Sequence, residues 1–362
     1  MRLHPHLYEA NALILLRRLS RKYGRKLTLS TVPEPEWQRL AQLGFDLLWL
    51  MGVWRRSPAS RQIARSHPGL CQEYDNALPG WVEQDVVGSP YAVHSYTLDP
   101  ALGQETDLPE LKARLNRQGL GLVLDFVPNH LARDHPWTLS HSDRFVQGSE
   151  EDVRDYPEWF FPTDRDVHLA HGRDPYFPPW TDTVQVNFFS SDLREALVGE
   201  LLSIAQVADG VRCDMAMLGL NSVFERAWGS VIWSYPRPGM EFWPDAIERV
   251  RQQHPAFLFL AEAYWGLEGE LQEMGFDFTY DKALYDHLRY SSPSDIRRHL
   301  EIIGPSQRRW ARFIENHDET RALAALGEDR SLAAAVVLGT IPGPAYFMTG
   351  NWRANAFACP FS

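Results

Sequence analysis

The sequence predicts a parallel α/β fold whose polar residues collect at one edge of the sheet. Strand-like and helix-like segments alternate along most of the 362 residues, a pattern typical of parallel strands covered by helices. In addition, four short apolar runs each end in carboxylates, an arginine or a histidine. The carboxyl ends of parallel strands lie at the same edge of a sheet, so we expect these four polar ends to converge.

The alternating segments can be followed from the N-terminus. Predicted strands are residues 8–16, 45–51, 122–124, 211, 257–261, 275–280, 313–314 and 341–348, and predicted helices are residues 35–43, 108–118, 191–207 and 332–338. Apolar residues at helix spacing, such as Leu108, Leu111 and Leu115, support the helices. Residues 131–190 break the rhythm, because they are rich in proline, aspartate, histidine and aromatic residues and show no helix period. An irregular stretch of this length is expected to have a function of its own.

The four apolar runs with polar ends are the strongest functional signal. They are Leu-Asp-Phe-Val-Pro-Asn-His, Gly-Val-Arg-Cys-Asp, Phe-Leu-Ala-Glu-Ala and Phe-Ile-Glu-Asn-His-Asp, at residues 124–130, 210–214, 259–263 and 313–318. In these motifs and their order, the chain resembles the α-amylase family of retaining α-glycosidases and transglycosylases. The resemblance covers roughly residues 5–347 and implies a (β/α)8 TIM barrel. Residues 1–130 and 191–350 would form the barrel, and residues 131–190 would be inserted after its third strand as domain B.

The same resemblance implies a catalytic trio. Asp214 would be the nucleophile, Glu262 the general acid/base, and Asp318 a third acid that holds sugar hydroxyls. Retaining cleavage needs two carboxyl groups roughly 5–5.5 Å apart, which neighbouring strands can provide. Arg212 precedes Asp214 by two residues, so both side chains should leave the same face of a strand, and the arginine should keep Asp214 ionised. Apolar neighbours and two anionic acids should raise the pKa of Glu262 and keep it protonated.

Four further residues complete the predicted site. His130 and His317 each follow an asparagine, and they resemble family histidines that hydrogen-bond the sugar being cleaved. Tyr91 resembles a tyrosine that stacks on this sugar, and Asp125 resembles a buried acid that orients Arg212. The alternative for each histidine or for the tyrosine is an ordinary packing role in the core.

Calcium is the one metal that the resemblance suggests. Asn129 matches a position that binds calcium in many α-amylases, but the Lys-His pair that follows the nucleophile in those enzymes is replaced by Met215-Ala-Met-Leu. We therefore expect that no cofactor is required and keep calcium as an alternative, with Asp152, Asp155 and Asp182 as further oxygen donors. The sequence contains no His/Cys cluster for a transition metal.

Composition indicates the kind of partner. A hydrophobic content of 44 % and a charged content of 23 % are those of an ordinary globular protein. The net charge of −11 and the lack of a basic stripe interleaved with aromatic residues predict that nucleic acid is not a partner. The resemblance implies that the substrate is an α-linked oligosaccharide or polysaccharide. No signal peptide or membrane-spanning run is recognisable, so we expect a cytoplasmic protein. The three cysteines are an odd number and lack metal-ligand spacing, so we expect no disulfides. Cys213 should point away from Arg212 and Asp214. The sequence predicts no oligomeric state.

The last residues depart from the resemblance. The family usually continues with a Gly-Gln segment, a helix and an all-β C-terminal domain, and we expect that domain to be absent. Restoring one nucleotide before Met348 gives a continuation closer to the family, so we hypothesise that residues 351–362 are an out-of-frame tail. The leading function is a retaining hydrolase of α-linked glucans. The alternatives are an α-glucan transglycosylase, a sucrose- or trehalose-active enzyme, and a truncated barrel that is inactive or only binds glycan.

Overall fold

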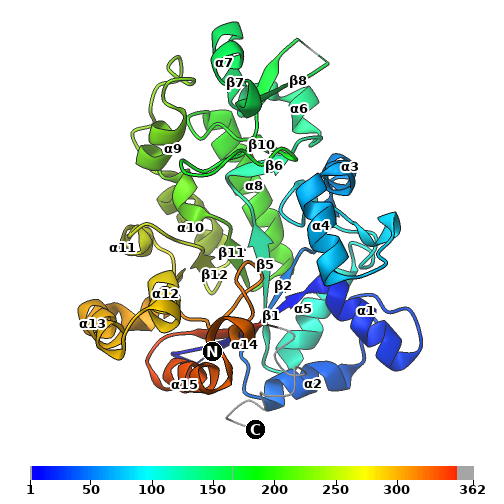
Figure 1. The fold of residues 1–362 in the computed structure, drawn as a ribbon, viewed down its shortest axis with the longest axis vertical. Helices are drawn as coiled ribbons and strands as arrows, with labels where there is room; N and C mark the ends of the chain where they lie inside the picture. Colours follow the sequence, from blue (N-terminus) through cyan, green and yellow to red (C-terminus); the bar gives the residue numbers. More distant parts are fainter. Residues whose placement is uncertain (1, 165, 349–362) are drawn as a thin grey trace.

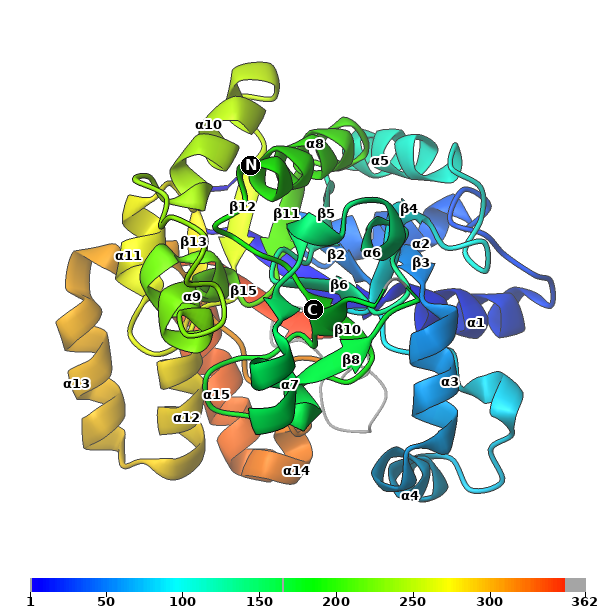
Figure 2. The ribbon, with the colours of Figure 1, turned by 90° about the horizontal axis from the view of Figure 1, so that it is seen from above.

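The computed structural model describes residues 2–164 and 166–348, so the predicted out-of-frame tail lies outside the described residues. Eight parallel strands form one sheet in the order β14-β13-β12-β11-β5-β2-β1-β15. Two backbone hydrogen bonds join its ends, because Arg312 N–H donates to the Pro344 carbonyl at 2.8 Å and Tyr346 N–H to the Arg312 carbonyl at 2.9 Å. The predicted (β/α)8 barrel is confirmed as a nearly closed sheet surrounded by helices (Figures 1 and 2). The strands are β1 (His6–Asn11), β2 (Leu47–Met51), β5 (Gly121–Phe126), β11 (Gly210–Cys213), β12 (Leu258–Ala261), β13 (Phe278–Tyr280), β14 (Trp310–Ala311) and β15 (Ala345–Met348).

Several strand boundaries differ from the prediction. β13 and β15 begin three and four residues later than predicted, and the first and seventh strands also differ. The first strand ends at Asn11, and residues 12–16 belong to helix α1 (Ala12–Tyr23), because the Asn11 side chain accepts the N–H of Ile14 at 3.1 Å and caps the helix. The seventh strand is β14, and the predicted residues 313–314 follow it. In both places the apolar run continues beyond the strand, because the neighbouring helix or loop residues are buried too.

Helices lie outside the barrel wall (Figure 2). They are α2 (Glu34–Gln42), α5 (Asp107–Arg117), α8 (Ser191–Val207), α10 (Phe242–Gln253), α11 (Glu268–Glu273), α12 (Lys282–Tyr290), α13 (Pro293–Ile303), α14 (Ala322–Leu326) and α15 (Glu328–Thr340). All four predicted helices are present, within a few residues of their expected bounds. None of the helices in the described ranges is both long and apolar enough to cross a membrane.

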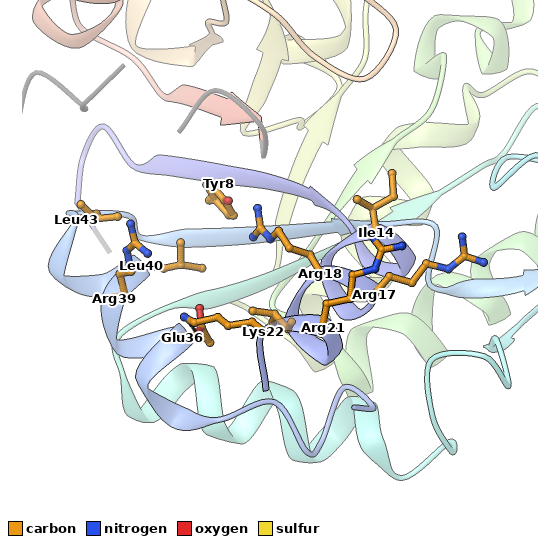
Figure 3. Close-up of a pocket in the computed structure, with 11 residues that line it drawn as sticks. Tyr8, Ile14, Arg17, Arg18, Arg21, Lys22, Glu36, Arg39, Leu40 and Leu43 are labelled. Carbon is orange, nitrogen blue, oxygen red and sulfur yellow. Dashed lines mark hydrogen bonds and ion pairs between the residues drawn. The ribbon is translucent and has the colours of Figure 1, made fainter. Parts of the chain in front are cut away.

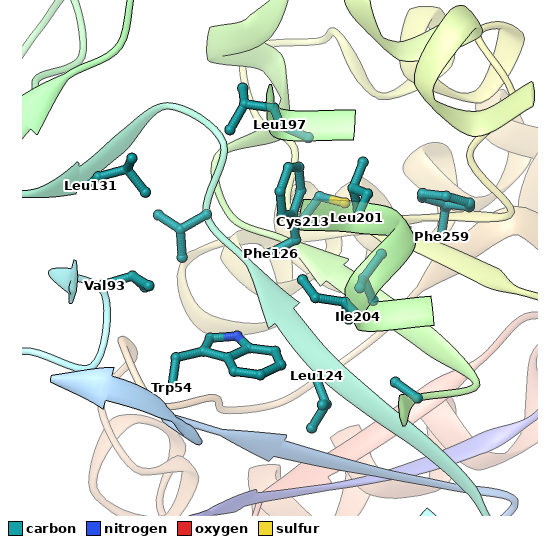
Figure 4. Packing of buried hydrophobic residues seen from close by; sticks show 14 of the residues in the cluster. Trp54, Val93, Leu124, Phe126, Leu131, Leu197, Leu201, Ile204, Cys213 and Phe259 are labelled. Carbon is teal, nitrogen blue, oxygen red and sulfur yellow. The ribbon is translucent and has the colours of Figure 1, made fainter. Parts of the chain in front are cut away.

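The outer face of the barrel wall packs against α8. The cluster drawn in Figure 4 includes Phe126, Leu197, Leu201, Ile204 and Phe259. Cys213 is fully buried in this layer, as the strand alternation predicted. Its neighbours Arg212 and Asp214 consequently point into the barrel.

Two insertions extend from the barrel. The first lies between β3 (Trp54–Arg56) and β4 (Val93–Leu98) and contains α3 (Pro58–Ser66) and α4 (Pro68–Ala77). The second follows β5, at the top of Figure 1. It contains the pair β6 (His130–Ala132) and β10 (Thr183–Gln185), the sheet of β7 (Gln147–Gly148), β9 (His168–Ala170) and β8 (Phe160–Pro162), and the short helices α6 (Trp137–Ser140) and α7 (Glu150–Asp155).

A basic groove of about 690 Å³ lies on the outside of the barrel between α1 and α2 (Figure 3). Five cations line it together with Glu36, namely Arg17, Arg18, Arg21, Lys22 and Arg39. This cluster was not predicted from the sequence. Its members on α1 lie close together because residues three and four apart share one side of a helix. The net charge of the whole chain is negative and does not reveal such a local cluster. None of the predicted catalytic residues lines this groove.

Candidate active site

The structure brings predicted site residues together at the carboxyl ends of the barrel strands. Asp125 lies on β5, Arg212 lies on β11 just before Asp214, and Glu262 follows β12. In the parallel pairing Arg212 lies beside Asp125 on one side and beside Leu260 on the other, two residues before Glu262. Since side chains alternate along a strand, these four polar side chains all face the inside of the barrel.

Arg212 is the centre of the site. Its side chain is fully buried. Nη1 lies 2.8 Å from Asp214 Oδ1 and 3.5 Å from Asp125 Oδ1, and Nη2 lies 2.7 Å from Glu262 Oε2. Nε donates to the Tyr280 hydroxyl at 3.2 Å. One planar, permanently charged group therefore connects carboxylates that come from three neighbouring strands.

Asp214 is subject to two opposing effects. Burial raises the pKa of its carboxyl, while the charge of Arg212 and its hydrogen bond lower that pKa, and the net pKa lies above the ordinary aspartate value. Arg212 thus acts in the predicted direction, but burial outweighs it.

The carboxylate of Asp125 is held by the barrel wall. Trp49 Nε1 donates to its Oδ1 at 3.2 Å, and Gly52 N–H donates to its Oδ2 at 3.4 Å. Burial raises the pKa of Asp125 to about 7, against the opposing positive charges of Arg212 and His317. Asp125 Oδ1 lies 3.5 Å from Arg212 Nη1, so its position suits orienting the guanidinium.

Glu262 accepts hydrogen bonds from two neutral donors. The Tyr264 hydroxyl donates to Oε1 at 2.6 Å, and the backbone N–H of Met215 donates to Oε2 at 2.7 Å. Met215 has a φ of 41°, a left-handed conformation that residues with side chains rarely adopt. Burial raises the pKa of Glu262, Arg212 lowers it, and nearby carboxylates such as Asp214 raise it, so the net pKa is above the ordinary glutamate value. This is the direction that a general acid requires.

His317 links the loop after β14 to the first strand. Its Nδ1 lies 2.7 Å from Glu9 Oε1, and its Nε2 lies 2.7 Å from the Tyr91 hydroxyl and 3.1 Å from Asp318 Oδ2. The Tyr91 ring stacks on the imidazole with centroids 5.3 Å apart. Burial lowers the pKa of His317, but the hydrogen bonds with Asp318 and Glu9 outweigh it and raise the pKa to about 10. The side chain is therefore a cation near neutral pH.

Asp318 is the most exposed of the three predicted acids. Its side chain is 56 % exposed, against 8 % for Asp214 and 4 % for Glu262. Burial raises the pKa of Asp318, yet the hydrogen bond and charge of His317 lower it further, so the net pKa is below the ordinary value. An accessible, ionised carboxylate is suited to accept hydrogen bonds from sugar hydroxyls.

The state of His317 predicts a pH dependence of stability. Its folded-state pKa of about 10 exceeds the ordinary 6.5, so its stabilisation is complete below pH 6.5 and is lost as the pH rises toward 10. The loss is at most about 1.4 kcal/mol per pH unit. We expect the difference in unfolding free energy between wild type and His317→Gln, measured by denaturant unfolding, to shrink steadily from pH 7 to pH 9. A constant difference over this range would contradict the raised pKa.

His130 is the first residue of β6, and Asn129 precedes it. His130 is buried with its ring centroid 4.9 Å from that of Trp180, and burial lowers its pKa to about 4, so it is neutral near pH 7. Gln185 Nε2 donates to both Oδ1 and the carbonyl oxygen of Asn129 at 3.0 Å and to the Val186 carbonyl at 3.2 Å. The Gln185 amide N–H groups thus donate to both oxygens of Asn129, the residue for which the resemblance suggested calcium.

The other suggested calcium ligands are engaged elsewhere. The contacts are Ser149 to Asp152, Arg154 to Asp155 and Ser60 to Asp182. In residues 2–164 and 166–348, no group of three His, Cys, Asp or Glu residues is placed to hold a metal ion.

Four residues of the site were not predicted from the sequence. They are Glu9, Tyr264, Tyr280 and Gln185. Glu9 is fully buried within an apolar strand, and a carboxylate in such a run is itself a signal that it has a buried partner. Tyr264 follows Glu262 by two residues, the spacing at which two side chains leave the same face of an extended segment. Tyr280 and Gln185 carry no signal in their local sequence.

Comparison with known proteins identifies relatives in sequence. Residues 37–189 match the α-amylase catalytic domain. The α-amylase MalA of Haloarcula japonica is 26 % identical over 280 residues, which are 74 % of this chain and 37 % of that protein. The α-1,4-glucan:maltose-1-phosphate maltosyltransferase of Pseudomonas aeruginosa is 26 % identical over 252 residues, 67 % of this chain and 31 % of that enzyme. The chain therefore spans about a third of the length of these two relatives.

Solved structures show the same fold. An α-amylase from Lactobacillus plantarum superposes with a TM-score of 0.62 at 21 % identity, covering 96 % of this chain and 71 % of that one. The cyclic α-maltosyl-(1→6)-maltose hydrolase from Arthrobacter globiformis, in complex with maltose, gives a TM-score of 0.60 at 17 % identity, covering 89 % and 65 %. The catalytic-domain match over residues 37–189 and the relatives in sequence support the resemblance to the α-amylase family that the four motifs indicated.

Proposed function

We propose that the chain hydrolyses α-linked glucans or oligosaccharides with retention, through a covalent glycosyl-enzyme intermediate. The observation that supports this most directly is that Asp214 and Glu262 contact the two terminal nitrogens of one guanidinium. Both carboxyl groups lie within 2.8 Å of the same guanidinium, which allows the separation of roughly 5–5.5 Å that a retaining pair needs.

In the first step Glu262 protonates the glycosidic oxygen while Asp214 attacks the anomeric carbon. The bond to the leaving group breaks, and a β-linked ester to Asp214 forms. The raised pKa of Glu262 keeps its proton available, and Arg212 stabilises the anionic nucleophile. The carboxylates of Asp214 and Asp318 stabilise the positive charge that develops on the sugar ring.

In the second step the ionised Glu262 takes a proton from the attacking hydroxyl, which displaces Asp214 from the sugar. Attack by water completes hydrolysis, and attack by a sugar hydroxyl transfers the glycosyl group. Because the relatives include α-amylases and maltosyltransferases, transglycosylation is the second candidate.

Product analysis tests the proposal. The chain, and a version with the reading frame restored before Met348, would be incubated with maltooligosaccharides, sucrose and trehalose while proton NMR follows the anomeric signals. Hydrolysis with retention gives the α-anomer first, and products longer than the substrate indicate transfer. A β-anomer as first product would contradict retention. No turnover, together with a thermal melt shifted by an oligosaccharide inhibitor, would favour a barrel that only binds glycan.

We further propose that the Gln185 amide substitutes for a calcium ion. Treatment with a chelator should leave the melting temperature and the activity of the wild type unchanged. Gln185→Glu would place a buried carboxylate beside the oxygens of Asn129 and Val186, costing about 1–3 kcal/mol for the lost hydrogen bonds alone. Added calcium should restore part of that loss. Loss of wild-type activity on chelation, reversed by calcium and not by magnesium, would overturn the proposal.

A further inference from the structure

A pocket of about 550 Å³ lies between the α3–α4 hairpin and the insertion after β5. We call it the α3–α4 pocket. Its walls are largely apolar and include Ile63, Leu70, Tyr74, Trp81, Val86 and Trp180. None of the residues predicted from the sequence to catalyse the reaction or to bind the sugar lines it.

Two aromatic side chains of this pocket are held in place at the protein surface. Trp81 Nε1 donates to Asp75 Oδ1 at 2.8 Å, and the Trp81 ring meets Tyr74 edge to face with centroids 5.3 Å apart. Both rings are only partly buried. A fixed aromatic ring loses little conformational entropy on binding, and it offers an apolar face on which the C–H face of a sugar can pack.

The pocket is joined to the active site at two points. Trp180 lines the pocket and contacts the His130 ring at 4.9 Å. Ser89 also lines the pocket, and its Oγ accepts the backbone N–H of Tyr91 at 3.1 Å. Trp180 and the segment from Ser89 to Tyr91 therefore lie between the pocket and residues of the predicted sugar site.

The hairpin that forms one wall is anchored to the insertion that forms the other. Ser60 Oγ donates to Asp182 Oδ2 at 2.6 Å, and Ala59 N–H donates to Asp134 Oδ2 at 3.0 Å. Gly88 has a φ of 84°, and a Cβ there would lie 2.9 Å from the backbone nitrogen of Arg61, so only glycine permits this close approach. The pocket is consequently preformed.

We propose that the α3–α4 pocket binds glucosyl units on the non-reducing side of the substrate. This inference rests on the proposed function, in which Tyr91 and His130 contact the sugar that is attacked. Glu262 protonates the leaving group, which lies on the reducing side, and Glu262 has no part in the pocket. Asp85 and Asp182 line the pocket and provide carboxylate acceptors for sugar hydroxyls. Substrates long enough to reach the pocket should therefore be preferred.

The test compares substrate lengths in Trp81 variants. Trp81→Ala should lower kcat/KM for an aryl α-maltoheptaoside roughly tenfold, mainly through KM, which corresponds to about 1.4 kcal/mol for one aromatic contact. Activity on an aryl α-glucoside should change less than twofold. Trp81→Phe keeps a ring and should recover most of the loss. Tyr290→Ala removes an exposed aromatic side chain on α12, which does not line the pocket, and should match the wild type on both substrates.

Each outcome decides between the hypotheses. An equal loss on both substrates, or no loss on either, in a Trp81→Ala protein that melts like the wild type would overturn the pocket assignment and leave the proposed function intact. A wild type that cleaves neither substrate would instead overturn the proposed function. Equilibrium binding of maltoheptaose to wild type and Trp81→Ala provides a readout that does not depend on turnover, and unchanged affinity would also overturn the assignment.

Discussion

Replacing Asp214 with asparagine should lower kcat on α-linked oligosaccharides by several orders of magnitude while leaving the barrel folded. The asparagine oxygen can still accept the hydrogen bond from Arg212 Nη1, and Arg212 keeps its contacts with Asp125 and Glu262. Only the negative charge needed to form the glycosyl ester is lost. Steady-state kinetics, with a thermal melt of the same sample, would measure both effects.

A matched aspartate outside the barrel provides the control for this variant. Asp245 lies on α10 with a half-exposed side chain 3.5 Å from Arg249. Asp245→Asn should therefore retain nearly full activity. If Asp214→Asn kept a tenth of the wild-type rate, Asp214 would not be the nucleophile.

Glu262→Gln should abolish turnover of substrates with poor leaving groups and spare the first step for an activated aryl glycoside. The glutamine keeps the shape of the side chain, and its oxygen can accept the N–H of Met215, but it has no proton to give. The alkaline limb of the wild-type kcat/KM profile, which reports the loss of that proton, should also disappear. Glu248→Gln, an exposed substitution on α10, is the matched control and should preserve both the rate and the profile.

Azide gives the variant a stereochemical readout. A small anion needs no general base, so azide should attack the glycosyl-Asp214 intermediate and release an α-glycosyl azide. Restored turnover with that product would fit both assigned roles. Isolation of a β-glycosyl azide would mean that the enzyme inverts, and no rescue by azide would remove Glu262 from its role in the second step.

The sequence was most informative where a residue's position on a strand determines where its side chain points. The alternation of Arg212, Cys213 and Asp214 placed two side chains inside the barrel and one outside, as the structure has them. The (β/α)8 architecture followed from motif order. The end of β1 at Asn11 was missed, because the apolar pattern continues into α1 and only the cap separates strand from helix.

Contacts between distant segments could not be predicted. Glu9 and His317 are 308 residues apart in the sequence, and only barrel closure brings them within 2.7 Å. Gln185 likewise meets Asn129 across 56 residues, where β10 pairs with β6. The net pKa of Asp214 was also beyond prediction, because it depends on how completely the folded barrel excludes water from a charge that Arg212 only partly compensates.

The alternation on β11 also protects the fold against misassembly. If this strand slipped by one residue against its neighbours, Arg212 would enter the apolar layer beneath α8 and Cys213 would face the carboxylates. A guanidinium without partners among Leu201 and Phe259 would be strongly destabilising, and so would carboxylates deprived of their cation. The charges proposed to perform the chemistry therefore also fix the strand register. A chain that has paired β11 correctly with β5 and β12 has already brought Arg212 together with the three carboxylates that it contacts.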